Sequence, residues 1–180
     1  MKTRAIAFSA MAFFAMPTVT LAANTINFSG EVTDQTCSAV IDGNTDPVVI
    51  LDSVPTTALS GVGSVAGETS FTVSLTGCTA PTNADEHFTT LFQAVNATSA
   101  GNLTNTAASG ATGVALQLLD QPSGTAVNLA GGAAVAAGDI VLATGETSAT
   151  YDYAVQYVAE AATVTPGPVL GSVTYTLRYE

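Results

Sequence analysis

Hydrophobic and polar residues alternate in several short segments of the chain. Ile26, Phe28, Gly30 and Val32 alternate with polar neighbours, and Phe71 to Leu75 repeats the pattern. A period of two is typical of an extended strand, whose successive side chains point to opposite faces. The same pattern, or a short apolar run, predicts further strands at 48–51, 91–95, 114–119, 151–157 and 173–179.

Turn-forming residues separate these segments. Clusters of Gly, Pro, Asn, Asp, Ser and Thr occur at 42–44, 60–61, 80–83, 121–124 and 165–168. Short strands divided by such turns, without an amphipathic helical stretch, predict an all-β sandwich. Two segments rich in Gly and Ala, 58–67 and 131–138, are predicted to be loops or irregular strands, and 87–100 has the weakest pattern.

The first residues have the pattern of an export signal. A short positive region, Lys2 to Arg4, precedes an uncharged apolar stretch that ends at Pro17 and is followed by small residues. This stretch is much shorter than the roughly 20 residues that cross a bilayer as a helix. We therefore expect residues 1–22 to be a signal peptide, cleaved after Ala22 or after Ala23.

Removal of that segment changes the charge of the chain. Arg178 becomes the only Lys or Arg, one positive charge against 14 from Asp and Glu, for a formal net charge of −13. Such a chain has no basic patch for nucleic acid and is repelled by anionic lipid headgroups. We expect neither nucleic-acid binding nor direct membrane binding. A composition of 47% hydrophobic and 9% charged residues is also the opposite of that of disordered chains.

Cys37 and Cys78 are the only two cysteines. Export places them in an oxidising compartment, which favours a disulfide between them. The bridge would close a loop of about 40 residues and stabilise the fold by roughly 4 kcal/mol. With His87 as the single histidine, these residues cannot assemble a tetrahedral zinc site, and we expect no metal or cofactor.

No pattern of catalytic residues stands out. Asp85 to His87 sets two acids beside an imidazole, but consecutive residues rarely converge on one substrate, so we expect a surface loop there. No serine occupies a G-x-S-x-G turn. The glycines at 61–63 do not lie between a strong strand and a helix, as a dinucleotide-binding loop requires. The segment 42–46 lacks the downstream glycine and glutamate of a calcium loop. We expect no enzymatic activity.

Two other patterns are interpreted as surface or core. Asn96 and Asn102 begin glycosylation sequons, which predict polar surface. Tyr151, Tyr153 and Tyr157 could form a sugar-binding patch. Their spacing of two favours a core or sheet face instead.

The two ends of the chain differ from those of an ordinary sandwich. The alternating segment 26–32 begins close to the expected start of the exported chain, and Glu180 follows the strand at 173–179. An immunoglobulin-like sheet usually has one more strand after such a segment. Without it, a groove with unpaired backbone and an exposed core remains open. An N-terminal strand from another copy could fill this groove.

Three stretches resemble the chaperone–usher fimbrial subunits, the type 1 pilin family. TINFSGEVTDQTC at 25–37 is similar to the start of the exported subunits, and GVALQLLD at 113–120 to a central strand. GSVTYTLRYE at 171–180 is similar to the terminal strand, with Tyr179 next to last. Gly167 stands fourteenth from the end, as in that family's C-terminal motif.

The resemblance implies an incomplete immunoglobulin-like β-sandwich that lacks its last strand and is completed by a donor strand from another subunit. Residues 23–33 would be the donor extension and residues 34–180 the pilin domain. The donor side chains that point into the groove would be Ile26, Phe28, Gly30 and Val32, with Gly30 where no side chain fits. Asn24 stands where a further apolar donor residue is expected.

The resemblance also implies partners and a location. A periplasmic chaperone would first fill the groove and bind the C-terminal strand and carboxylate, and an outer-membrane usher would then exchange it for the next subunit's extension. The residues concerned would be Gly167, Val173, Tyr175, Leu177, Tyr179 and Glu180. The protein would pass through the periplasm and become a structural subunit of a bacterial surface fimbria that supports cell adhesion.

Three other functions compete with this interpretation. A minor, adaptor or tip subunit could bind glycans directly, although tip adhesins usually add a lectin domain for which this chain has no length. A small periplasmic hydrolase would need a nucleophile, base or metal set that the sequence lacks. A soluble extracellular binding sandwich would leave the unusual ends of the chain unexplained.

Overall fold

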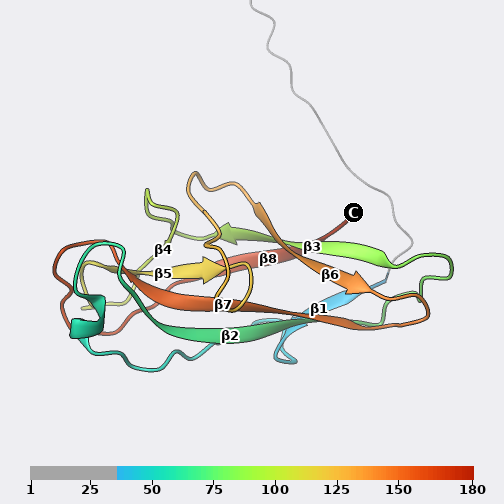
Figure 1. Cartoon of the computed structure of the whole chain (residues 1–180), viewed down its shortest axis with the longest axis horizontal. Helices are drawn as coiled ribbons and strands as arrows, with labels where there is room; N and C mark the ends of the chain where they lie inside the picture. Colours follow the sequence, from blue (N-terminus) through green and yellow to red (C-terminus); the bar gives the residue numbers. More distant parts are fainter. Residues whose placement is uncertain (1–35) are drawn as a thin grey trace, which may run out of the picture. The chain divides into compact units, whose positions relative to one another are not determined.

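The computed structural model describes residues 36–180, which form two β-sheets packed face to face (Figure 1). One sheet has five strands in the order β1-β2-β7-β5-β4, and the other has three in the order β6-β3-β8. The strands are β1 Ser38–Ile41, β2 Val65–Thr76, β3 Glu86–Ala94, β4 Leu103–Thr104, β5 Val114–Leu119, β6 Val135–Leu142, β7 Ala149–Ala159 and β8 Val173–Tyr179. A 3₁₀ turn, η1, covers Thr56–Leu59.

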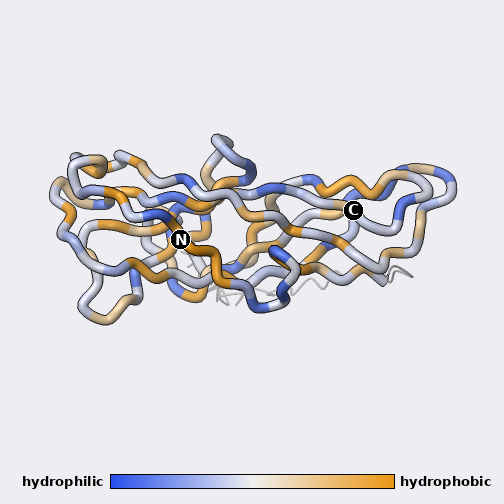
Figure 2. Tube along the Cα trace, turned by 90° about the horizontal axis from the view of Figure 1, so that it is seen from below, coloured by the Kyte–Doolittle hydropathy of each residue, from blue (hydrophilic) through white to orange (hydrophobic). Residues whose placement is uncertain are grey.

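All the strand pairs are antiparallel, and the core lies between the two sheets. The fully buried large side chains come from both layers, and Figure 2 shows hydrophobic positions distributed along the strands. They are Val73, Leu75, Phe88, Thr90, Phe92, Leu129, Ile140, Leu142 and Tyr153. Alternating strands thus bury one face each, as the sequence pattern predicts.

Tyr153 is the polar centre of this core. Its ring packs edge-on against Phe92 of the facing sheet, with 5.0 Å between ring centroids. Its hydroxyl oxygen lies 2.9 Å from Thr90 Oγ1 and 2.8 Å from the carbonyl oxygen of Ala137. Burial raises the pKa of Tyr153 to about 12, because the charged phenolate would lose its water. The interpretation of this tyrosine as a core residue is confirmed.

The expected disulfide joins the two strands at one edge of the larger sheet. Cys37, just before β1, is bonded to Cys78, just after β2. A hydrogen bond of 2.6 Å from Thr36 Oγ1 to the carbonyl oxygen of Gly77 lies beside the bridge. The disulfide therefore fixes the start of β1 against the end of β2.

The strand predictions at 114–119 and 173–179 agree with β5 and β8. The predictions at 71–75, 91–95 and 151–157 fall within or overlap longer strands, whereas β1 and β4 were not predicted and β6 begins inside a predicted loop or irregular strand. The prediction of a buried strand at 48–51 is wrong. That segment forms no strand, and Val48 and Ile50 are 86% and 83% exposed, because no neighbouring strand pairs with it.

Two further expectations need correction. Asn102 is not surface-exposed: its amide is buried and donates to Glu160 Oε1 at 2.7 Å. His87 lies in β3 and not in a loop, with its ring exposed and Nδ1 2.8 Å from Asp139 of β6. Within residues 36–180, no helix is long and apolar enough to cross a membrane.

Candidate functional site

The most open part of the core lies along β8. This strand pairs only with β3 among the described strands, so its other edge carries unpaired backbone groups. The inward side chains of β3, such as Phe88 and Phe92, are fully buried. The inward side chains of β8 are only half-buried, from Val173 to Tyr179. The sandwich is therefore uncovered on this side.

A groove of about 680 Å³ follows this open edge. Its floor is apolar and is formed by core side chains of both sheets: Ile41, Phe71, Phe92, Leu103, Leu116, Leu118 and Val155. One wall is the chain from Leu170 to Thr176, which includes the first half of β8. This wall supplies backbone hydrogen-bonding groups, and the floor supplies apolar surface.

The opposite wall is the segment 45–51. Val49 and Leu51 pack against the core cluster, while the side chains of Val48 and Ile50 are exposed. The segment is thus extended, with the same alternation as a strand. Residues 46–54 make no backbone–backbone hydrogen bond with the described part of the chain. The edge of β8 away from β3 and the segment 46–51 therefore have no backbone partner among the described residues, whereas Leu170 is hydrogen-bonded to Asn105 and Thr106.

The two walls run in opposite directions. At one end, the hydroxyl of Tyr175 donates a hydrogen bond to the carbonyl oxygen of Thr45 at 3.1 Å. At the other end, Val54 and Val169 pack on the same small apolar cluster. A strand that is antiparallel to β8 would consequently run parallel to the segment 45–51.

The groove has little charge. Asp46 is the single acidic residue that lines it, and no basic residue does. Burial, and next the nearby Asp46 carboxylate, raise the pKa of Tyr175 above its usual value. No group of three or more His, Cys, Asp or Glu side chains that could hold a metal ion occurs in the described range. This composition suits an apolar, extended ligand.

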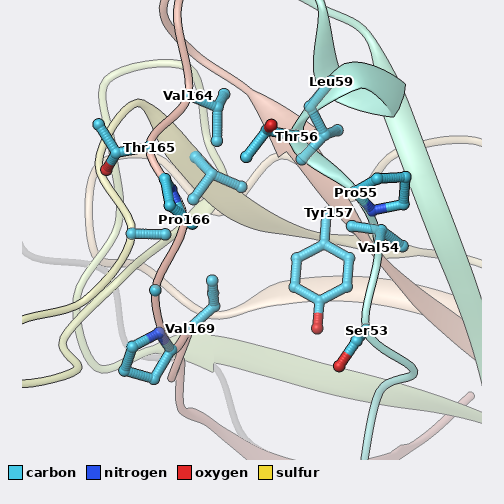
Figure 3. Close-up of a pocket in the computed structure, with 14 residues that line it drawn as sticks. Ser53, Val54, Pro55, Thr56, Leu59, Tyr157, Val164, Thr165, Pro166 and Val169 are labelled. Carbon is cyan, nitrogen blue, oxygen red and sulfur yellow. The ribbon is translucent and has the colours of Figure 1, made fainter.

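A second hollow, of about 470 Å³, lies where the walls of the groove continue (Figure 3). Figure 3 shows Tyr157 between the Val54–Pro55 wall and the wall that contains Pro166 and Val169. Burial and the neighbouring Asp52 raise the pKa of Tyr157. The hollow contains no set of groups that could perform a reaction.

The C-terminal residues that the sequence predicts to form the site lie in two places along β8. Val173 and Tyr175 line the groove, whereas Leu177 packs on the core cluster and Tyr179 packs there against Phe88, with ring centroids 4.9 Å apart. The backbone N–H of Glu180 donates to the carbonyl oxygen of His87 at 3.0 Å, which holds the chain end beside β3.

Gly167 lies before β8 and lines the second hollow. It has a positive φ of 156°, and a Cβ atom there would come 2.6 Å from the backbone nitrogen of Ala111. Only glycine allows so close an approach between the two chain segments.

The donor residues Ile26, Phe28, Gly30 and Val32 lie outside the described residues. Sequence reasoning missed the wall at 45–51 and the floor, because the continuous apolar run at 48–51 predicts a buried strand and not a half-buried wall. The floor residues are dispersed over six strands, so no local pattern could have grouped them.

Known proteins resemble the chain over most of its length. Residues 26–180 match a family model described as Fimbrial protein. The F17 fimbrial protein of Escherichia coli is 37% identical over 158 residues, which cover 86% of either chain. The major fimbrial subunit SMF-1 of Stenotrophomonas maltophilia (strain K279a) is 39% identical over 168 residues, 88% of this chain and 96% of that relative.

A solved structure supports the fold. The crystal structure of an antigen and type I fimbria protein of Burkholderia pseudomallei aligns with a TM-score of 0.56 and 26% identity. The alignment covers 81% of this chain and 99% of that chain.

Proposed function

Because this chain belongs to the fimbrial protein family, we propose that its copies polymerise by lending an N-terminal strand to the groove of a neighbouring copy. As a member of that family it is a non-enzymatic, structural subunit of a fimbria on the bacterial surface. The proposal concerns how the subunits join. Residues 23–33 of one copy would be the strand that fills the groove of the next.

The observation that carries this proposal is the groove, whose wall backbone is largely unpaired among the described residues. An extended strand placed between β8 and the segment 45–51 could form hydrogen bonds on both sides. The wall from Leu170 to Thr176 has the same number of residues as the alternating segment from Ile26 to Val32. Each would span about 20 Å as a strand. The groove and the segment therefore match in length.

The alternation of the donor segment also matches the groove. An added strand antiparallel to β8 continues the alternation of directions in the sheet of β6, β3 and β8. Ile26, Phe28 and Val32 would then face the apolar floor, with Gly30 between them. At about 2 kcal/mol for each buried side chain, these three would contribute on the order of 6 kcal/mol. Backbone pairing would add to this.

The contact is head to tail, because donor segment and acceptor groove are different parts of the chain. A heterologous contact of this kind propagates into an open filament instead of closing a dimer. Similarity to a major fimbrial subunit favours a place in the main length of the fibre over the tip.

Assembly requires that the open groove be protected until a neighbour arrives. An exposed core beside an unpaired edge strand is prone to aggregation. We assign this protection to a periplasmic chaperone, which would pair with β8 and hold the carboxylate of Glu180 after the signal peptide at 1–22 has directed export. An outer-membrane usher would then be the place where the donor segment replaces the chaperone.

The proposal can be tested by deletion of Ala23 to Thr33. The truncated subunit should accumulate with its chaperone but should form no fibres when the usher is present, as seen by electron microscopy of sheared surface material. A matched control replaces Asn27 and Ser29, which would face away from the groove in the proposed register, with alanine and should assemble normally. Normal fibres from the deletion variant would rule out strand donation by this segment.

A further inference from the structure

Tyr175 crosses the groove from one wall to the other. Its side chain projects from the inward face of β8, and its hydroxyl donates to the carbonyl oxygen of Thr45 at 3.1 Å. Both residues line the cavity. Within residues 36–180, no other hydrogen bond joins β8 to the segment 45–51. Among the described residues, the Tyr175 side chain therefore makes the single hydrogen bond between the two walls.

The acceptor of this bond directly follows a hydrogen-bonded turn, whereas the chain after it lacks backbone hydrogen bonds to the described residues. Ile41 and Asn44 close a tight turn immediately before Thr45, with N···O distances of 2.8 and 2.9 Å. From residue 46 to residue 54 the backbone has no backbone partner in the described structure. The bond thus joins the segment 45–51 to β8 at the end that follows the turn, while Val49 and Leu51 hold the rest of the segment by apolar packing.

A strand that is added along β8 must lie between these two walls. Adjacent strands are about 4.8 Å apart, so the new backbone and its inward side chains would take the space that the Tyr175 side chain crosses. We propose that the Tyr175–Thr45 hydrogen bond is a latch that joins the two walls across the groove and must break before a donor strand can enter. The inference rests on the proposed function, and it adds a residue pair that limits how fast a donor strand enters the groove.

If the Tyr175–Thr45 bond is a latch, removal of the Tyr175 hydroxyl should speed the binding of a donor peptide. The exported full chain, starting at Ala23, is mixed at low concentration with a fluorescent peptide of residues 23–33, and binding is followed by anisotropy. Loss of one hydrogen bond from the empty state should make Tyr175→Phe bind about three- to tenfold faster than the wild type. Tyr151→Phe is the matched control, since Tyr151 lies on β7 outside the lining of the groove and no hydrogen bond joins its hydroxyl to the described residues. Its binding rate should stay within about twofold of the wild type.

The outcomes separate the latch from strand donation itself. Equal rates for wild type and Tyr175→Phe would overturn the latch and leave strand donation standing. Slower binding by Tyr175→Phe would also overturn it, because the hydroxyl would then stabilise the filled groove. If neither wild type nor variants bind the peptide, the proposed function fails and the latch with it. A thermal melt checks that each variant is folded. Tyr175→Leu, which also lacks the hydroxyl, carries the same expectation if Tyr175→Phe does not fold.

Discussion

At the scale of single residues, Tyr153 connects the two sheets through one buried hydroxyl. Its partners, Thr90 Oγ1 and the carbonyl oxygen of Ala137, belong to β3 and β6 of the facing sheet. Tyr153→Phe should lower the free energy of unfolding by about 1–3 kcal/mol, because buried polar atoms lose a partner. Urea denaturation measures this. Tyr151→Phe, on the same strand but half-buried, should change it by less than about 0.5 kcal/mol.

The same tyrosine should make stability depend on pH in the alkaline range. Its pKa is about 12 in the folded chain and about 10 when unfolded, so the unfolded state loses the proton first. The contribution is complete below pH 10 and is lost as the pH rises toward 12. Tyr153→Phe should lose less stability than the wild type over this interval. An identical decline in both proteins would show that Tyr153 does not carry the effect.

At the scale of elements, strongly alternating strands could be predicted from sequence and irregular ones could not. The strands β5 and β8 have uninterrupted patterns and were identified with their observed bounds. In β6, Gly138 has a positive φ of 73°, and the pairing with β3 shifts register beside it, so the alternation is broken. β1 has four residues and β4 two, which is too short for a pattern.

Of the two walls of the groove, only the one that includes β8 could be predicted from the sequence. The resemblance to pilins implies a sandwich without its last strand, and β8 pairs only with β3 among the described strands. The wall at 45–51 has the pattern of a strand, but whether such a segment is paired depends on neighbours distant in sequence. Here no described strand pairs with it, and Val48 and Ile50 remain exposed.

Gly167 tests how the segment that leads into β8 is positioned. Gly167→Ala should destabilise the fold by more than about 2 kcal/mol, since a Cβ would meet the backbone at Ala111 in addition to the strain of a positive φ. Gly145→Ala is the matched control: its φ is 87°, but nothing lies within 4 Å of the added Cβ. It should cost about 1 kcal/mol, measured by urea denaturation. Equal losses in the two variants would show that contact with Ala111 is unimportant.

At the scale of the whole molecule, charge and apolar surface have separate roles. With residues 1–22 removed as proposed, the chain has one basic residue, Arg178, which pairs with Glu180 in the same subunit. Attraction between opposite charges therefore cannot be the main force that joins identical subunits. The groove has an apolar floor and wall backbone that is largely unpaired among the described residues, and the proposed donor segment has apolar residues at alternate positions. Apolar burial and backbone pairing are left as the driving forces for assembly.

Backbone amide hydrogen exchange of β8 tests strand donation most directly. In isolated subunits, the amides of 172–179 that point away from β3 have no strand partner among residues 36–180 and should exchange rapidly. In assembled fibres, strand donation should make these amides strongly protected. Mass spectrometry of peptides that cover β8 measures this protection. If β8 exchanges equally fast in subunit and fibre, and protection appears only on other surfaces, then β8 receives no donor strand in the fibre.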